Sequence, residues 1–133
     1  MKNLKSQIIA ISDIPNKNNR IYPKEVLEKV IEDFENNKEE IFGYIGMPLA
    51  GEDHIHNISH VIKKLYMSNN CLIADIKILD TPKGIELLRI IKEEEIVFRL
   101  KGIAKTEKIS GNYLIKKGYK LLSINAVNKQ EAA

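Results

Sequence analysis

The segment formed by residues 71–79 limits the folds open to this chain more than any other feature. An apolar side chain recurs there at every second position from Leu72 to Ile78, which is the period of a strand with one buried face. A second strand candidate, residues 59–67, precedes it, and Asn69-Asn70 lies between the two. Because asparagine tolerates the left-handed backbone of a tight turn, the pattern predicts a β-hairpin.

Two other segments have the spacing of amphipathic helices. Residues 23–36 place apolar side chains at helical intervals between charged ones, and Pro23 suits the first helical position because it has no N–H to leave unpaired. A second helix is predicted from Thr81 to about Glu94. Thr81 is its expected N-cap, and Pro82 follows at the first helical position.

Further strands are predicted from short apolar runs that are bounded by turn residues. They cover residues 7–14, 96–105, 113–115 and 119–127. With six or seven strands and at least two helices, the sequence predicts an α+β fold. We expect a mainly antiparallel β-barrel flanked by the helices, formed as a single domain over residues 1–133.

Composition narrows the class of protein. The chain has 133 residues, 44% of them hydrophobic, which is enough for one globular core. The net charge is +3, with basic and acidic residues interleaved rather than gathered in a basic stripe, and this argues against nucleic-acid binding. One cysteine excludes an intramolecular disulfide and fits a reducing compartment. The N-terminal apolar run is too short to span a bilayer, so no membrane association is expected.

Six short phrases, in order, resemble the prohead (capsid-maturation) protease family of tailed phages. They extend over most of the chain, and their order and spacing carry the resemblance more than any single phrase does. The phrases are residues 19–23 (NRIYP), 43–48 (GYIGMP), 57–62 (NISHVI), 78–84 (ILDTPKG), 101–103 (KGI) and 123–127 (SINAV). The resemblance implies a herpesvirus-protease-type β-barrel and an ancestry of serine peptidases that use a histidine base.

The resemblance also implies that the catalytic groups are replaced here. Met47 occupies the histidine position of the Gly-x-x-x-His-Pro phrase, and a thioether cannot accept a proton. Arg99 or Leu100 falls at the position of the serine nucleophile. Since serine hydrolysis needs an activated hydroxyl and its base together, this reading predicts a pseudoenzyme without catalytic residues. A cation at position 99, with Lys101 beside it, is a candidate for binding an anion in the old cleft.

The three histidines offer two rival interpretations. His54, His56 and His60 lie within seven residues and have carboxylates beside them, a spacing that can hold zinc or a similar ion. The competing interpretation is plain loop or core histidines, with no metal or cofactor bound. A further alternative is that His54 and His56 contact a ligand without a metal. The second rival is a relocated hydrolase with Ser59 or Ser123 as nucleophile and His54, His56 or His60 as base. Against it, Ser59 and His60 would point to opposite faces if both lie on a strand.

The sequence therefore predicts a protein-binding relative of the prohead proteases. Its expected role is a head-assembly scaffold component or a regulator, in the host cytoplasm or the phage prohead. Its expected partners are phage capsid or scaffold proteins, an active protease, or a second copy in a homodimer. One alternative is a phage protein that binds a small molecule or signal in the old cleft, for example against host defence. The other is an active serine peptidase of capsid maturation with a relocated site.

Overall fold

The computed structural model describes residues 2–37, 40–47 and 55–130. Four strands form the largest sheet, which is antiparallel and has the order β1-β5-β4-β3. The bounds of these strands are β1 (Lys2–Ile11), β5 (Cys71–Ile78), β4 (His60–Ser68) and β3 (Phe42–Gly43). The predicted hairpin is confirmed as β4–β5, with Asn69 and Asn70 in the left-handed region at φ 50° and 65°.

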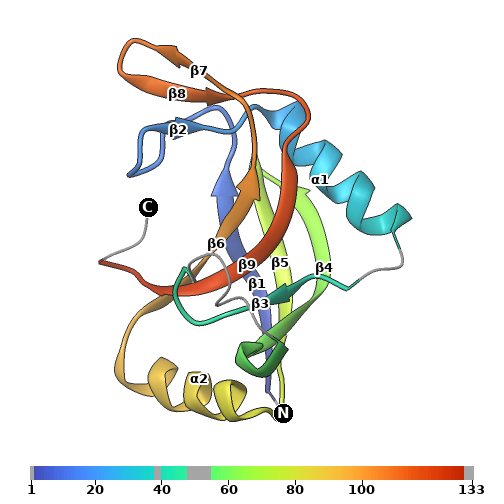
Figure 1. Cartoon of the computed structure of the whole chain (residues 1–133), viewed down its shortest axis with the longest axis vertical. Coiled ribbons are helices and arrows are strands. Elements are labelled where there is room, and N and C mark those ends of the chain that lie inside the picture. Colours follow the sequence, from blue (N-terminus) through green and yellow to red (C-terminus); the bar gives the residue numbers. More distant parts are fainter. Residues whose placement is uncertain (1, 38–39, 48–54, 131–133) are drawn as a thin grey trace.

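Two long strands, β6 (Ile96–Ile103) and β9 (Lys120–Asn128), pair antiparallel and curve across the large sheet (Figure 1). Residues 44–46, which follow β3, join the large sheet to this β6–β9 pair. Ala126 donates its backbone N–H to the carbonyl of Tyr44 at 2.9 Å and accepts from the N–H of Gly46 at 2.7 Å. The strands together form a curled half-barrel, as expected for the predicted α+β class.

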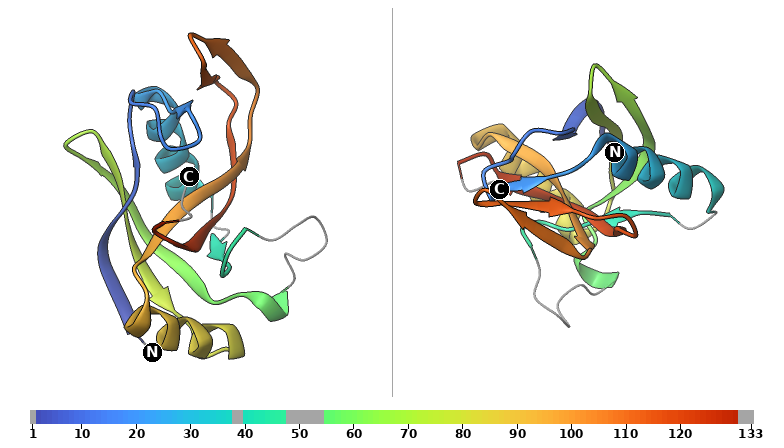
Figure 2. Two further views of the ribbon diagram at one scale, coloured as in Figure 1. Left: turned by 90° about the vertical axis from the view of Figure 1, so that its left-hand side faces the viewer. Right: turned by 90° about the horizontal axis from the view of Figure 1, so that it is seen from above.

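A smaller sheet has the order β2-β8-β7 and projects beyond the curled sheet, at the end opposite α2 (Figure 2). Its strands are β2 (Arg20–Ile21), β8 (Asn112–Ile115) and β7 (Thr106–Ile109), and β2 runs parallel to β8. The described residues thus contain nine strands rather than the six or seven predicted. The additional ones are β2, β3 and β7, which are too short or too exposed to show an apolar period.

The helices match the predicted ranges to within one residue, although Pro23 is the N-cap of the first helix rather than its first helical residue. They are α1 (Lys24–Asn36) and α2 (Pro82–Glu93), with a single 3₁₀ turn over Ile55–Asn57. Thr81 caps α2 as expected, because its Oγ1 accepts the N–H of Gly84 at 2.9 Å. No helix in the described part of the chain is both long and apolar enough to cross a membrane.

Strand β1 begins and ends earlier than the apolar run suggested. Its polar first half pairs with β5, and the strand stops at Ile11 because the Ser12 N–H bonds to Asn70 and Asp13 turns to φ 65°. A bulge interrupts the strand at Ser6, whose φ is 54°.

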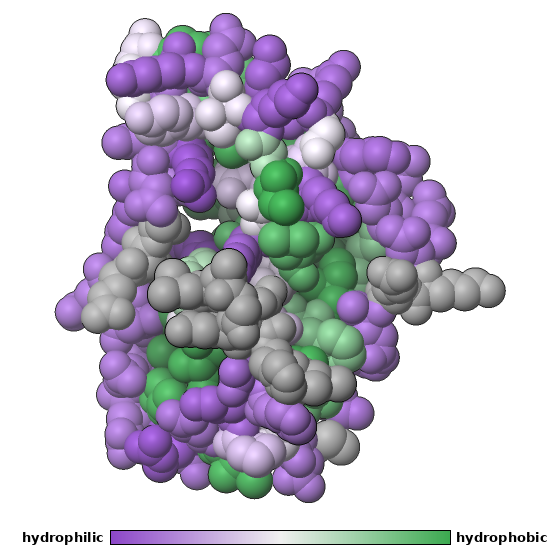
Figure 3. All heavy atoms as spheres, in the orientation of Figure 1, coloured by the Kyte–Doolittle hydropathy of each residue, from purple (hydrophilic) through white to green (hydrophobic). Residues whose placement is uncertain are grey.

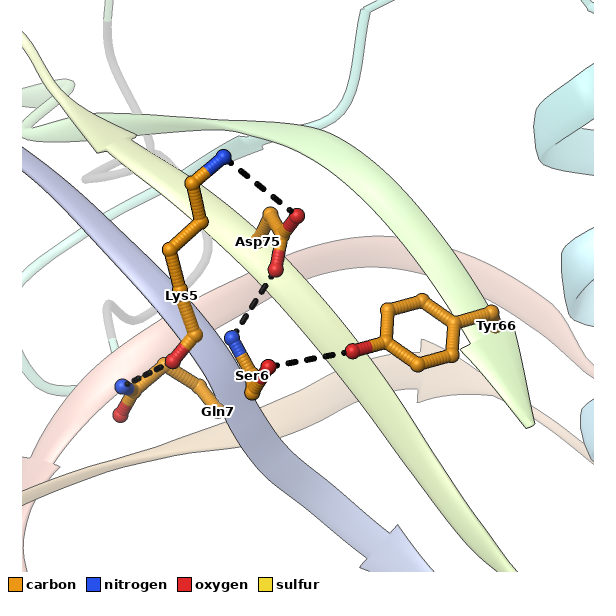
Figure 4. A network of polar contacts seen from close by, with 5 residues as sticks. All are labelled: Lys5, Ser6, Gln7, Tyr66 and Asp75. Carbon is orange, nitrogen blue, oxygen red and sulfur yellow. Dashed lines mark hydrogen bonds and ion pairs between the residues drawn. The ribbon is translucent and has the colours of Figure 1, made fainter. Parts of the chain in front are cut away.

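A polar network fixes this bulge (Figure 4). The carboxylate of Asp75 accepts the Ser6 N–H at 2.9 Å and lies 3.8 Å from the ammonium of Lys5. The Ser6 hydroxyl lies 3.2 Å from that of Tyr66. These contacts satisfy a backbone group that the bulge removes from the ladder.

The core lies between the two curved layers and is built mostly of aliphatic side chains. Leu27 of α1, Leu87 of α2 and Phe98 of β6 are fully buried in it. Aliphatic residues from β4, β5 and β9 complete it, as the low aromatic content of 6% requires.

Candidate functional site

A cavity of about 650 Å³ lies between β1 and β6. The loop before β2 and the paired rings of Tyr22 and Tyr119 form its other walls. The surface is hollowed on the corresponding side of the molecule, below the projecting small sheet (Figure 3). A volume of this size is typical of small-molecule sites.

The structure brings Met47, Arg99, Leu100 and Lys101 to this one cavity. Met47 is 46% exposed, and its sulfur lies 3.3 Å from Nδ2 of Asn125. Asn125 is fully buried and stands opposite Arg99 in the β6–β9 ladder. Residues about fifty positions apart in the sequence are therefore neighbours around one buried amide, and none of the four cavity residues is a serine or histidine.

Arg99 ties the edge of β6 to β1. Its Nη1 donates to the carbonyl of Ile8 at 3.3 Å and to that of Phe98 at 2.9 Å. The side chain is half-buried, and this burial lowers the pKa of Arg99 below its usual value. In the part of the chain that the structure describes, no carboxylate forms an ion pair with this guanidinium.

His60 and Ser59 form a sealed pair elsewhere in the molecule. The Ser59 hydroxyl lies 2.7 Å from Nδ1 of His60, and Nε2 of the same ring lies 2.7 Å from the carbonyl of Ile124. Since a carbonyl only accepts, Nε2 carries the proton and Nδ1 accepts from the serine. The expected opposite orientation of these side chains is wrong, because Ser59 precedes β4 and strand alternation does not apply to it.

The pair is inaccessible to a substrate. Both residues are 0% exposed, and the His60 ring packs edge-on against Phe98 at a centroid distance of 5.1 Å. Burial lowers the pKa of His60 to about 4, so the ring is neutral near pH 7. Ser123, the other candidate nucleophile, is 3% exposed.

Of the two other histidines, only His56 is among the described residues. It is exposed in the middle of the 3₁₀ turn, and His54 lies outside the described residues. Both ring nitrogens of His60 are already engaged. Within the described ranges, no three His, Cys, Asp or Glu residues are grouped so that they could hold a metal ion.

Sequence reasoning missed two cations that face the same cavity, Lys17 and Arg20. Lys17 lies in the polar loop before β2, and Arg20 is the first residue of that two-residue strand, so no period or motif distinguished their side chains. It also missed Asn125 as the amide that Met47 contacts. The only available signal was its place in the closing phrase of the family resemblance.

No family model matches the chain, and no curated protein matches it. Among solved structures the chain is similar to the bacteriophage T4 capsid assembly protease, gp21, with a TM-score of 0.81 at 19% sequence identity. The match covers 92% of this chain and 79% of that one. The chain therefore has a prohead-protease-like fold.

Proposed function

We propose that this chain is a non-catalytic, prohead-protease-like protein that acts in capsid maturation by binding other head proteins. The observation that carries the proposal is the cavity itself. The family resemblance assigns the base to Met47 and the nucleophile to Arg99 or Leu100, and all three side chains line one cavity. A thioether, a guanidinium and an isobutyl group provide neither a nucleophile nor a base.

The buried pair supports the same conclusion. Ser59 and His60 have the hydrogen bond of a nucleophile and its base, but they are closed off by the core. Ser123 is buried as well. A relocated peptidase would need one of these serines to reach solvent, so the sealed positions weigh against it.

The proposed partners are capsid or scaffold proteins, an active protease of the same phage, or a second copy of the chain. The proposed location is the host cytoplasm or the prohead. A protein that keeps the fold of an enzyme but has other residues at the catalytic positions is typically retained for what its surface binds rather than for catalysis. As regulator or scaffold component, the chain would dock on the molecules that an active relative processes.

The test is co-elution in size-exclusion chromatography. The purified chain is mixed in turn with the capsid, scaffold and protease proteins of the same phage. We expect a stable complex with at least one of them and no new fragments after long incubation. Failure to co-elute with any of the three, or their cleavage by the chain, would contradict the proposal.

A second candidate function is the binding of a small molecule or signal in the cavity. The observation that favours it is the half-buried guanidinium of Arg99, with which no carboxylate of the described residues forms an ion pair. It would be preferred if a small anion co-purifies with the chain and no head protein binds.

A further inference from the structure

Among the described residues, the charged side chains that line the cavity between β1 and β6 all have the same sign. Its described lining contains the cations Lys17, Arg20, Arg99 and Lys101 and no aspartate or glutamate. We propose that this cavity binds a small phosphate-bearing molecule, with cations from β6 and from the β2 loop holding the phosphate groups. This phosphate-binding site goes beyond the proposed protein-binding role. It can be disproved while the protein-binding role still holds.

Arg99 is the strongest indication of an anion. A half-buried charge is costly unless something compensates it, and no described carboxylate does so. Its two hydrogen bonds to carbonyls both use Nη1, so within the described residues the donors on Nη2 and Nε remain available to a ligand. A planar guanidinium fork matches two oxygens of a phosphate group.

Arg20 supplies a second guanidinium from a different element. Its backbone N–H bonds to Oδ1 of Asn16 at 3.0 Å, and the neighbouring Asn19 carbonyl accepts the N–H of Tyr113 at 2.6 Å. Lys17 in the same loop is held by the carbonyl of Lys129 at 3.2 Å. These contacts hold the loop in place, so the cations are positioned before any ligand arrives.

The contacts and the size of the cavity favour a compact organic phosphate over an added peptide strand. Adding a strand to β1 requires its free carbonyls, and Arg99 already occupies that of Ile8. Around the opening, Ile8, Ile11 and Ile14 are 53%, 48% and 58% exposed. An apolar wall beside clustered cations fits a ligand with an organic part and a phosphate part, and about 650 Å³ is enough for a nucleotide-sized molecule.

The experiment is isothermal titration of the full chain with inorganic phosphate, pyrophosphate, AMP and ADP at constant ionic strength. We expect at least one phosphate probe to bind with a submillimolar Kd. A preference for AMP or ADP would identify an organic phosphate, and equal binding of pyrophosphate would identify the phosphate group alone as the ligand. Either result supports the site.

Three variants make the test specific. Arg99→Gln and Arg20→Gln should each weaken binding about tenfold or more, as expected for the loss of a charge-assisted hydrogen bond. Arg89→Gln, on the exposed face of α2, makes the same change of charge outside the cavity and should leave binding unchanged. Circular dichroism checks folding. If Arg99→Gln does not fold, the variant Arg20→Gln, at an exposed position, provides the test instead.

Three outcomes would overturn the inference. The first is the absence of binding by every phosphate probe at millimolar concentration. The second is equal weakening by Arg89→Gln and by the cavity variants, which would indicate attraction to net charge alone. The third is binding of a glutamate-rich peptide that no phosphate probe displaces. Co-elution with head proteins, measured separately, shows whether the protein-binding role survives such a failure.

Discussion

The Nε2 of His60 lies 2.7 Å from the backbone carbonyl of Ile124, a hydrogen bond that links β4 to β9 through the core. It is possible only because Gly43 has no side chain. A Cβ at position 43 would lie 1.9 Å from that nitrogen and 2.0 Å from the carbonyl oxygen. The three residues therefore form one packed unit that joins the two layers of the curled sheet.

Replacing Gly43 with alanine should disrupt this unit. The methyl group would displace both the ring and the carbonyl, and we expect a loss of about 3 kcal/mol in the free energy of unfolding. Urea denaturation measures the change. A loss below about 1 kcal/mol would mean that the hydrogen bond and the close packing around it contribute little.

The same histidine should make stability depend on pH. Its pKa is about 4 in the folded protein and 6.5 in the unfolded chain, so the unfolded state binds more protons between these values. Stability is therefore complete above about pH 6.5 and falls as the pH drops towards 4. The predicted loss between pH 7 and pH 4.5 is about 2–3 kcal/mol.

Urea unfolding at several pH values measures this slope. The control variant His60→Asn removes the titrating group and should flatten the slope, although it lowers stability overall. If the variant keeps the full slope, other groups cause the pH dependence.

Thr81 joins the start of α2 to the segment before β4. Its hydroxyl accepts from the Gly84 N–H at 2.9 Å and donates to the Ile58 carbonyl at 2.7 Å. Thr81→Ala should cost about 1–2 kcal/mol in unfolding free energy. Thr81→Ser keeps the hydroxyl and should recover most of it, so equal losses in the two variants would assign the effect to the methyl group.

The hydroxyl of Tyr119 is buried over Gly102, and the described residues provide no hydrogen-bond partner for it. Burial, together with the adjacent Tyr22, raises the pKa of Tyr119. Since an unpaired buried hydroxyl is unfavourable, Tyr119→Phe should keep or raise stability, by up to about 1 kcal/mol. A clear drop in the thermal midpoint would reveal a partner for the oxygen.

Local sequence signals predicted those elements whose residues have a strong individual preference. Asn69-Asn70 specified the β4–β5 turn, and Thr81-Pro82 specified the start of α2, because each satisfies a backbone requirement that few residues can meet. Strand β7 was missed because all four of its residues are exposed, so neither face imposes an apolar period.

The candidate site was only partly predictable. The resemblance pointed to Met47 and Arg99, but neither residue has a pattern of its own that marks a cavity. The contributions of Arg20 and Asn125 depend on how β2 and β9 fold back towards β6, which is a long-range property. The sealed Ser59–His60 pair was misjudged because β4 begins at His60, one residue later than the predicted strand 59–67.

The most direct test of the central claim is treatment of the folded chain with a fluorophosphonate probe, followed by intact-mass measurement. Such a probe reacts covalently with a serine that has an activating base and an open approach. We predict no adduct, since the described Ser–His pair is closed to solvent and the cavity presents Met47, Arg99 and Leu100. A stoichiometric adduct that depends on one serine would contradict the account of a non-catalytic protein.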